Sequence, residues 1–302
     1  MLSAEFKPEI LDKAIWYFNE RERIRLLKES DAPKPWTKDI ILQHYSFTNI
    51  LRRHDKTSQF FIQKHYQPNY DAPFKEAILN ATILRYFGSI AFAEEHQWVT
   101  LEILNDPVRL EKQLQDTYDR VVAKGEKPFT SAYVVTNMGM RLPKQEIVIQ
   151  RFVLPLALEL DRLEAVYEAH GKKWRPLAEF MIKNLTGFAD FMTKEVLQDV
   201  IYTNVLAGYE DSLEWTPVGP GAIKGMNWLL GNKLTDPAGK SLERMKVFRE
   251  ILLEKAEPHM TPILGEFDLH GAQVLQCELQ KYFRTHFGEG KPKRKYPGYA
   301  TR

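Results

Sequence analysis

Apolar residues recur at three- and four-residue spacing along most of the chain. Two examples are Ile10, Ala14, Tyr17 and Phe18, and further on Val148, Phe152, Leu156 and Leu160. This spacing puts the apolar side chains on one face of a helix, whereas a strand would alternate apolar and polar positions. Proline and glycine lie between these periodic segments, as expected for short connections. The pattern predicts a mainly α-helical fold.

The length of the chain allows more than one arrangement of these helices. With 302 residues, 44% of them apolar, the chain can bury a substantial core. We expect either a single helical domain over residues 1–302 or two helical lobes, one formed by about 1–125 with the C-terminal segment and one by about 140–260. The tail, residues 288–302, is basic and rich in Gly and Pro, which predicts a mobile arm that is either solvated or in contact with a phosphate backbone.

Composition narrows the class of protein without selecting a partner. Lys and Arg total 42 against 40 acidic residues, so the net charge of +2 does not by itself indicate nucleic acid. The single cysteine, Cys277, excludes an internal disulfide framework and a multi-cysteine metal site, which fits a reducing compartment. The histidines lack the spacing of local metal ligands, so no metal-binding residues are predicted. Neither a secretory signal nor a membrane-spanning run is present, and we expect a soluble, cytoplasmic protein.

A glycine-proline motif marks the predicted start of one helix. Residues 214–231 read EWTPVGPGAIKGMNWLLG, with Pro220 at the first helical position between Gly219 and Gly221. The glycines let another group approach backbone amides that have no intrahelical partner, and Lys224 adds a charge one turn later. The motif is therefore either a plain turn into a helix or a phosphate site.

A second short motif predicts a hairpin of two helices. Within KNLTGFADFMTKEVLQDV (183–200), the turn Thr186-Gly187-Phe188 follows a predicted helix over 175–184 and precedes another. A glycine at such a bend can direct amides at one DNA phosphate, as helix-hairpin-helix elements do. Ala189 stands where these hairpins usually carry a second glycine, so an ordinary helix connection is the alternative.

Several polar residues are candidates for chemistry or binding. Asp199 shares a helical surface with Glu195. It could accept a proton from a nucleophile or bind its amino group, or it could only form a surface pair or a cap. Lys194 is either a phosphate contact or a solvated lysine on a helix. Asn49, Arg52 and Asp55 are spaced i, i+3, i+6, which predicts neighbours along one helical side, with an Arg52–Asp55 salt bridge as the alternative.

Aromatic and C-terminal residues complete the candidates. Trp215 could stack against an extruded base, whereas Trp36 is expected in the core. Glu278 and Lys281 lie one turn apart and form either part of a pocket or a structural pair. The sequence has no GxxxxGK[ST] loop, which argues against this chain being a P-loop kinase.

Four blocks in this order carry a family resemblance: PWTKDIILQHYSFTNILRRHD (35–55), LTGFADFMTKEVLQD (185–199), WTPVGPGAIKGMNWLLG (215–231) and QCELQKYFRTHFGEGKPKRKYPG (276–298). Together they resemble the alpha-glutamyl/putrescinyl-thymine pyrophosphorylase family, phage-associated proteins related to helix-hairpin-helix DNA glycosylases. The resemblance implies a DNA-glycosylase-like helical fold. It also implies an amino acid or polyamine:DNA transferase that replaces the pyrophosphate of pyrophosphorylated 5-hydroxymethyluracil in duplex DNA.

The same resemblance implies partners and site residues. A hydroxymethyluracil DNA kinase would prepare the substrate in the infected bacterial cell. No cofactor is evident. Whether a divalent metal ion accompanies the pyrophosphate stays open. The implied catalytic residues are Asp199, Glu278 and Lys194. The implied substrate-binding residues are Asn49, Arg52, Asp55, Gln198, Trp215, Gly219, Gly221, Lys224 and Lys281, and the DNA contacts are Thr186, Gly187 and Phe188. Two alternatives stay open: a DNA N-glycosylase and a non-catalytic DNA-binding protein. Phe191 and Gly219-Pro220 stand where bifunctional glycosylases carry their lysine and aspartate, which disfavours the first.

Overall fold

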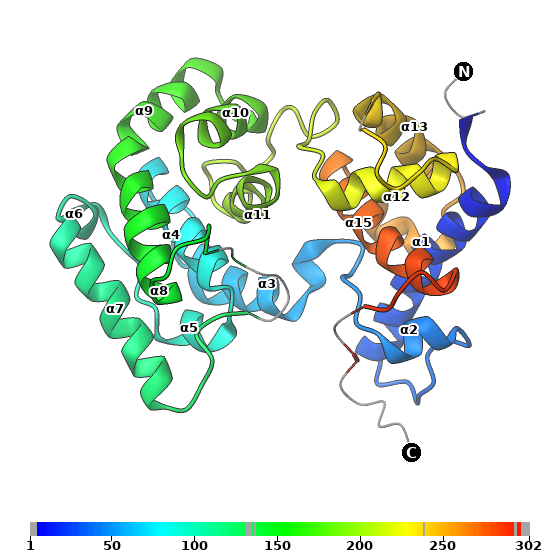
Figure 1. Ribbon diagram of the computed structural model, residues 1–302, viewed down its shortest axis with the longest axis horizontal. Helices are drawn as coiled ribbons and strands as arrows, with labels where there is room; N and C mark the ends of the chain where they lie inside the picture. The colour runs from blue at the N-terminus through cyan, green and yellow to red at the C-terminus, as the bar shows by residue number, and fades with distance from the viewer. Residues whose placement is uncertain (1–4, 131–134, 136, 238, 293–294, 297–302) are drawn as a thin grey trace. The chain divides into compact units, whose positions relative to one another are not determined.

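The computed structural model describes residues 5–130, 135, 137–237, 239–292 and 295–296. Within these ranges the protein is helical and contains no strand, only two isolated β-bridges (Figure 1). The predicted α-helical class is confirmed. The helices are α1 (Pro8–Glu29), α2 (Ile40–His44), α3 (Lys56–Phe61), α4 (Phe74–Phe87), α5 (Ile90–Glu95), α6 (Leu101–Leu104), α7 (Pro107–Ala123), α8 (Lys144–Ile147), α9 (Leu154–His170), α10 (Trp174–Asn184), α11 (Asp190–Val200), α12 (Pro220–Leu230), α13 (Ser241–Glu254), α14 (Thr261–Leu264) and α15 (Leu269–His286).

Four shorter turns complete the helical elements. Two are 3₁₀ turns, η2 (Arg52–His54) and η5 (Pro258–Met260), and two are π-helical, η3 (Ile62–Tyr66) and η4 (Val148–Val153). Wide π turns inside α-helices are uncommon and often lie at functional sites. Both of them lie within residues 56–211.

The chain forms two compact units. Unit 1 consists of residues 1–55 together with 212–302, and unit 2 is the continuous segment 56–211. The lobe boundaries expected near residues 125 and 140 differ from these. The reason is that α4 packs against α9 and α11, which joins residues on both sides of those expected boundaries in one core.

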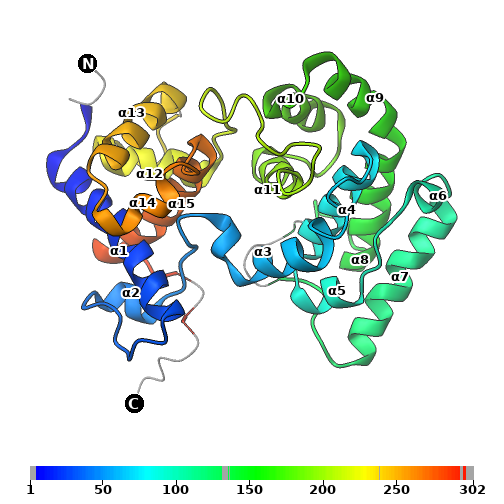
Figure 2. The ribbon, with the colours of Figure 1, turned by 180° about the vertical axis from the view of Figure 1, so that it is seen from behind.

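Unit 1 is built around α12 and α15, which pack side by side (Figure 2). Its core includes Phe18 on α1, which contacts Phe267 with ring centroids 4.9 Å apart. Glycine allows the close approach of the two central helices. A Cβ on Gly225 would lie 2.2 Å from the Gln276 carbonyl oxygen, so no larger residue fits without separating the backbones.

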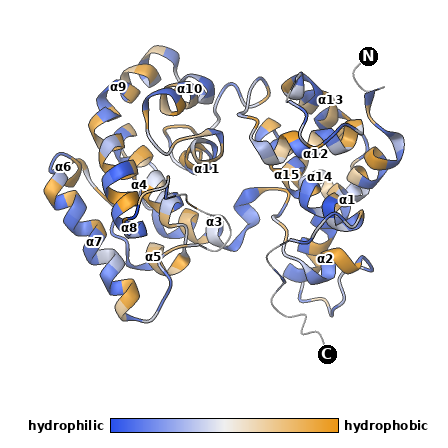
Figure 3. Ribbon diagram, in the orientation of Figure 1, coloured by the Kyte–Doolittle hydropathy of each residue, from blue (hydrophilic) through white to orange (hydrophobic). Residues whose placement is uncertain are grey.

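Unit 2 is built around α4, on which nearly every residue is buried. Helices apolar on all sides belong in the centre of a core, whereas the outer helix α7 is amphipathic, with mixed polar and apolar residues along it (Figure 3). Asn80 on α4 hydrogen-bonds the backbone of the adjacent loop. Its amide donates to Val99 O at 2.9 Å, and its Oδ1 accepts from Val99 N at 2.9 Å.

Part of the basic tail is held against unit 1. Tyr296 N donates to His44 O at 2.8 Å, and Lys295 forms a β-bridge with Tyr45. The expectation of a mobile arm is therefore wrong for Lys295 and Tyr296, because backbone hydrogen bonds fix them. Residues 293–294 and 297–302 of the predicted arm lie outside the described residues.

Candidate functional site

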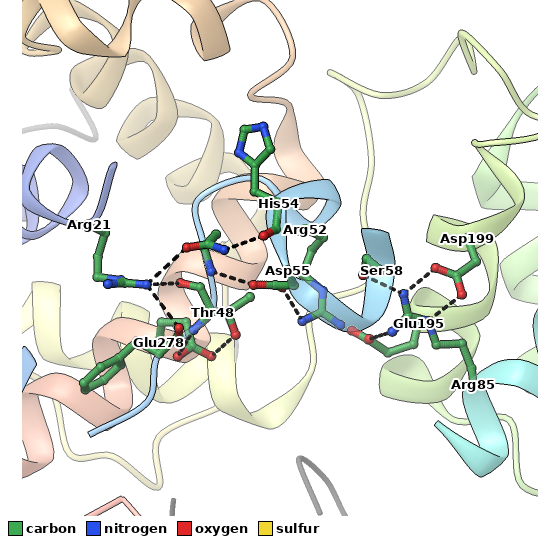
Figure 4. Close-up of polar contacts among 12 residues, drawn as sticks. Arg21, Thr48, Arg52, His54, Asp55, Ser58, Arg85, Glu195, Asp199 and Glu278 are labelled. Carbon is green, nitrogen blue, oxygen red and sulfur yellow. Dashed lines mark hydrogen bonds and ion pairs between the residues drawn. The ribbon is translucent and has the colours of Figure 1, made fainter. Parts of the chain in front are cut away.

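A network of charged side chains lies buried in unit 2, between α4 and α11 (Figure 4). Asp199 is fully buried and accepts Arg85 Nε on Oδ2 at 2.6 Å, while Arg85 Nη2 bonds Oδ1. Tyr66 Oη donates to the same Oδ2 at 2.7 Å. Bidentate pairing of this kind fixes both position and orientation of the guanidinium.

The network continues along α11. Glu195 lies one turn before Asp199, with Oε2 3.7 Å from Arg85 Nη1, and its Oε1 accepts Lys194 Nζ at 3.0 Å. Arg85 Nη2 also donates to Ser58 Oγ at 3.2 Å. The four charged side chains are each at most 3% exposed. Two cations and two carboxylates removed from water carry a large desolvation cost, so each is held by an opposite charge.

The local fold explains how these groups meet. Arg85 lies in the last turn of the apolar helix α4, and Tyr66 is the last residue of the π-helical turn η3. Glu195 and Asp199 are four residues apart and share a face of α11. Burial raises the pKa of the Asp199 carboxyl, while Arg85 and Tyr66 act in the opposite direction.

The hydrogen bonds of Asp199 limit what it can do. Both of its oxygens already accept hydrogen bonds, so abstracting a proton would require it to give up a contact with Arg85 or Tyr66. The arrangement is suited to orienting Arg85. The alternative of a surface pair for Asp199 is wrong, because the carboxylate is not at the surface.

Gln198 retains unused hydrogen-bonding capacity. It is 3% exposed, and its Oε1 has no hydrogen-bond partner among the described residues. Lys194, one turn earlier, lies 5.3 Å from the ring centroid of Phe191, which is itself 38% exposed. Gln198, Lys194 and Phe191 thus place an amide, a cation and an aromatic ring along α11.

The predicted turn between helices is present between α10 and α11. Gly187 has φ +88°, and a Cβ there would lie 2.4 Å from Phe152 Cδ1, so both its conformation and its packing require glycine. Its carbonyl accepts Tyr86 Oη at 2.9 Å, and Phe188 is buried against the same tyrosine. Thr186 is exposed. Gly187 and Phe188 therefore have structural roles in holding the turn.

A second polar cluster lies in unit 1. Asn49, Arg52 and Asp55 come together, but on a loop that ends in the 3₁₀ turn η2. The prediction of one helical side is wrong, because Asp55 Oδ1 accepts Asn49 N at 3.0 Å and Asn49 Nδ2 donates to His54 O at 2.8 Å, which closes a turn instead. Arg52 Nη1 donates to Asp55 Oδ2 at 3.1 Å, as the salt-bridge alternative expects. Burial raises the pKa of Asp55, against the effect of Arg52.

Residues from α1 and α15 hold this loop. Arg21 Nη2 donates to Phe47 O at 3.1 Å and to Asn49 Oδ1 at 3.3 Å. Glu278 accepts from Thr48 N at 3.2 Å and from Thr48 Oγ1 at 3.0 Å, and it pairs with Lys281 Nζ at 2.6 Å. Glu278 and Lys281 thus form the expected pair, and Glu278 fastens α15 to the loop.

The glycine-proline motif begins α12, with Gly219 at the N-cap and no side-chain cap. A Cβ on Gly221 would lie 2.9 Å from Cys277 Sγ on α15, so this glycine also serves close helix packing. Lys224 is exposed and Trp215 is half-buried. Among the described residues, no side chain caps the first amides of α12, which is compatible with the predicted phosphate contact and with a plain turn.

Sequence reasoning missed four central members of the two clusters: Tyr66, Arg85, Thr48 and Arg21. The sequence does indicate that Arg85 is unusual. It is the one arginine in the apolar run FKEAILNATILRYF, and a buried cation there needs an anion as partner. Nothing in the sequence indicates that Asp199 is its partner.

In the ranges that the structure describes, no helix has the length and apolarity to cross a membrane. Over the same ranges, no three His, Cys, Asp or Glu side chains gather as metal ligands would.

Comparisons with known proteins identify the family. A 5-hmdU DNA kinase of Bacillus phage SP10 is 25% identical over 281 residues, which cover 85% of this chain but 42% of that kinase. The chain therefore spans less than half the length of this relative. No solved structure matches, so the DNA-glycosylase-like architecture is not confirmed. The family model for the helical domain of 5-hmdU DNA kinase, rather than the expected pyrophosphorylase family, matches residues 8–291, and the chain belongs to the 5-hmdU DNA kinase helical-domain family.

Proposed function

We propose that this chain acts on phage DNA containing 5-hydroxymethyluracil, as an amino acid or polyamine:DNA transferase. The family and the name of the phage relative support a role in hydroxymethyluracil modification. The buried network around Arg85 and Asp199 is the observation that carries the proposal of chemistry. Charges so costly to bury are typical of sites that bind and stabilise charged groups.

The proposed reaction replaces pyrophosphate on the exocyclic carbon of the base. The carbon–oxygen bond breaks with its electron pair going to pyrophosphate, the donor amine forms a carbon–nitrogen bond, and the amine loses a proton. Lys194 and Arg85 stabilise the negative charge of the leaving group, since fixed cations do so without reorganising. Glu195 is the candidate acceptor of the proton, and Asp199 orients Arg85.

In this proposal, Gln198 recognises the base by hydrogen bonding. Uracil presents a donor at N3 and acceptors at O2 and O4, and a carboxamide complements an adjacent donor and acceptor. The unpartnered Oε1 of Gln198 supports this role. Entry of a base requires that it leave the duplex stack, as in other enzymes that modify bases.

The cluster of unit 1 and the start of α12 are proposed as additional substrate contacts. Arg52, Asn49 and Asp55 are held in one turn, and Lys281 is half-exposed beside Glu278. At the start of α12, Gly219, Gly221 and Lys224 offer uncapped amides and an exposed cation to a phosphate. Trp215 is a stacking candidate close in sequence to these residues.

A non-catalytic DNA-binding role is the second candidate. It is favoured by the hydrogen bonds of Asp199, whose oxygens are both engaged, and by the lack of a P-loop motif in this sequence. In that case the chain would recognise DNA for chemistry performed elsewhere.

Mass spectrometry of nucleosides separates these functions. Purified chain is incubated with pyrophosphorylated hydroxymethyluracil DNA and a mixture of glycine, serine, glutamate and putrescine, and in parallel with unphosphorylated hydroxymethyluracil DNA and ATP. An amine adduct of the nucleoside in the first reaction supports the transferase. Phosphorylated nucleoside in the second, or binding of modified DNA with no product in either, contradicts it.

Two variants locate the chemistry. Lys194→Gln is expected to lower the rate of adduct formation at least tenfold, whereas Lys183→Gln, which changes an exposed lysine in the same unit, is expected to retain it. Circular dichroism of both variants verifies that they are folded. Equal activity of the two variants would remove Lys194 from the site.

A further inference from the structure

A group of cations and aromatic rings gathers on unit 1, and none of its members belongs to the two polar clusters. This cation–aromatic patch consists of Lys28, Lys34, Trp36, Lys295 and Tyr296. Chain segments about 250 residues apart are joined there by hydrogen bonds, because Tyr296 N donates to His44 O and Ser46 Oγ donates to Lys295 O at 3.1 Å. The patch is therefore a product of the fold.

The rings of the patch are held at a fixed angle. Trp36 and Tyr296 meet edge to face, with centroids 6.1 Å apart and planes at 86°. Trp36 Nε1 donates to Ala32 O at 2.7 Å, which fixes the indole. Both rings are half-buried, so part of each aromatic surface remains accessible.

The lysines of the patch are exposed and carry unpaired charge. Lys34 Nζ lies 5.1 Å from the centroid of Trp36 and 5.5 Å from that of Tyr296, and Lys28 Nζ lies 5.8 Å from Tyr296. Among the described residues, no carboxylate oxygen lies within 4.0 Å of Lys28, Lys34 or Lys295.

Nearby acidic residues do not cancel this charge. Glu29 forms an ion pair with Arg25, and Asp31, two residues later, adds one exposed carboxylate. The surface is therefore net positive, with hydrophobic ring faces among the cations. A protein surface of this composition is complementary to a polyanion that also carries flat, apolar faces.

We infer that the cation–aromatic patch binds an unpaired DNA strand. The lysines contact successive phosphates, and a base released from its stack lies against Tyr296 or Trp36. An aromatic ring contacts any base, so this binding is independent of sequence. A duplex offers phosphates but not base faces, which is why the rings favour an unpaired strand. The inference rests on the proposed function only in taking DNA as the nucleic acid.

Fluorescence anisotropy with labelled, unmodified oligothymidylate tests the inference on the full chain. Replacing two phosphate contacts in Lys34→Ala/Lys295→Ala is expected to lower the slope of log K against log salt by about 1.4. Tyr296→Ala is expected to weaken binding roughly five- to hundredfold, the range for loss of one stacked base. Tyr296→Phe keeps the ring and is expected to bind as the parent chain does.

Controls separate this surface from general charge effects and from catalysis. Lys233→Ala removes an exposed lysine of the same unit outside the patch, and it is expected to leave affinity unchanged. Equal affinity of Tyr296→Ala and the parent chain, or binding of the matching duplex in preference to the single strand, would overturn the inference. The assay contains no modified base and no amine donor, so failure of the proposed transferase reaction leaves its result intact.

Discussion

The charge of Asp199 compensates that of Arg85 inside unit 2, and removing it should be costly. Asp199→Asn leaves a buried guanidinium with a neutral partner, and we expect a loss of about 3 to 5 kcal/mol in the free energy of unfolding. Urea denaturation followed by circular dichroism measures this loss. Asp161→Asn is the control, because Asp161 also pairs with a cation, Lys75 Nζ at 2.5 Å, but its side chain is 85% exposed. Equal stability of the two variants would show that the buried pair contributes little.

Two buried histidines of unit 2 should make stability depend on pH. Burial lowers the pKa of His96 to about 3, and it lowers the pKa of His65 as well; the rings lie 5.6 Å apart. Because the unfolded chain binds protons that folded His96 does not, stability is full above about pH 6.5 and falls with pH below it. For His96 alone the loss at pH 5 is about 2 kcal/mol.

Urea denaturation between pH 8 and pH 5 measures this dependence. His96→Gln keeps a hydrogen-bond donor towards Asn80 Oδ1, which lies 3.0 Å from His96 Nε2, but it does not titrate. The variant should therefore lose less stability on acidification than the parent chain. His170→Gln, at an exposed position on α9, is the matched control. If His96→Gln lost as much stability between pH 8 and pH 5 as the parent chain does, titration of His96 would not explain the pH dependence.

At the scale of elements, the turn between α10 and α11 depends on Gly187. Gly187→Ala combines a positive φ with a Cβ 2.4 Å from Phe152, and we expect a loss of roughly 2 to 4 kcal/mol in the free energy of unfolding. Gly208→Ala is the matched control: its φ is +68° and nothing lies within 4 Å of its Cβ, so only the conformational cost of about 1 to 2 kcal/mol applies. Thermal unfolding of both variants measures the difference. If they lose equal stability, contact with Phe152 does not determine the turn.

The packing of α12 on α15 gives a test of what Gly221 does. Gly221→Ala places a Cβ 2.9 Å from Cys277 Sγ, and we expect a loss of about 1 to 3 kcal/mol. Adding Cys277→Ala removes the sulfur and should restore most of the stability. If activity on DNA returns together with stability, Gly221 serves helix packing; if stability returns alone, its amide contacts the substrate.

The two polar clusters differ in how far local rules predict them. Helix periodicity is local, so the helical class and the turn at Gly187 follow from the sequence. The Asn49–Asp55 segment does not form the predicted helix, because its side chains bond the backbone of a turn instead. Arg85 and Asp199 are 114 positions apart, and their pairing depends on how α4 packs on α11. Spacing along the chain contains no information about that contact.

At the scale of the whole molecule, unit 2 should fold by itself. Residues 56–211 are continuous and contain their own core around α4. We expect a fragment of these residues to unfold cooperatively in urea, with coincident transitions in near- and far-ultraviolet circular dichroism. A fragment with helical signal but no fixed aromatic signal would show that unit 2 needs unit 1 to pack.

The division of unit 1 into residues 1–55 and 212–302 has a consequence for biosynthesis. On the ribosome, α1 emerges long before α12 and α15, against which it packs. Unit 2 can complete its core while α15 is still being made, and synthesis of the roughly 75 residues from Ser212 to His286 takes about 4 to 15 s. During that interval the apolar face of α1 has no native partner, so the nascent N-terminal segment is where a chaperone should bind.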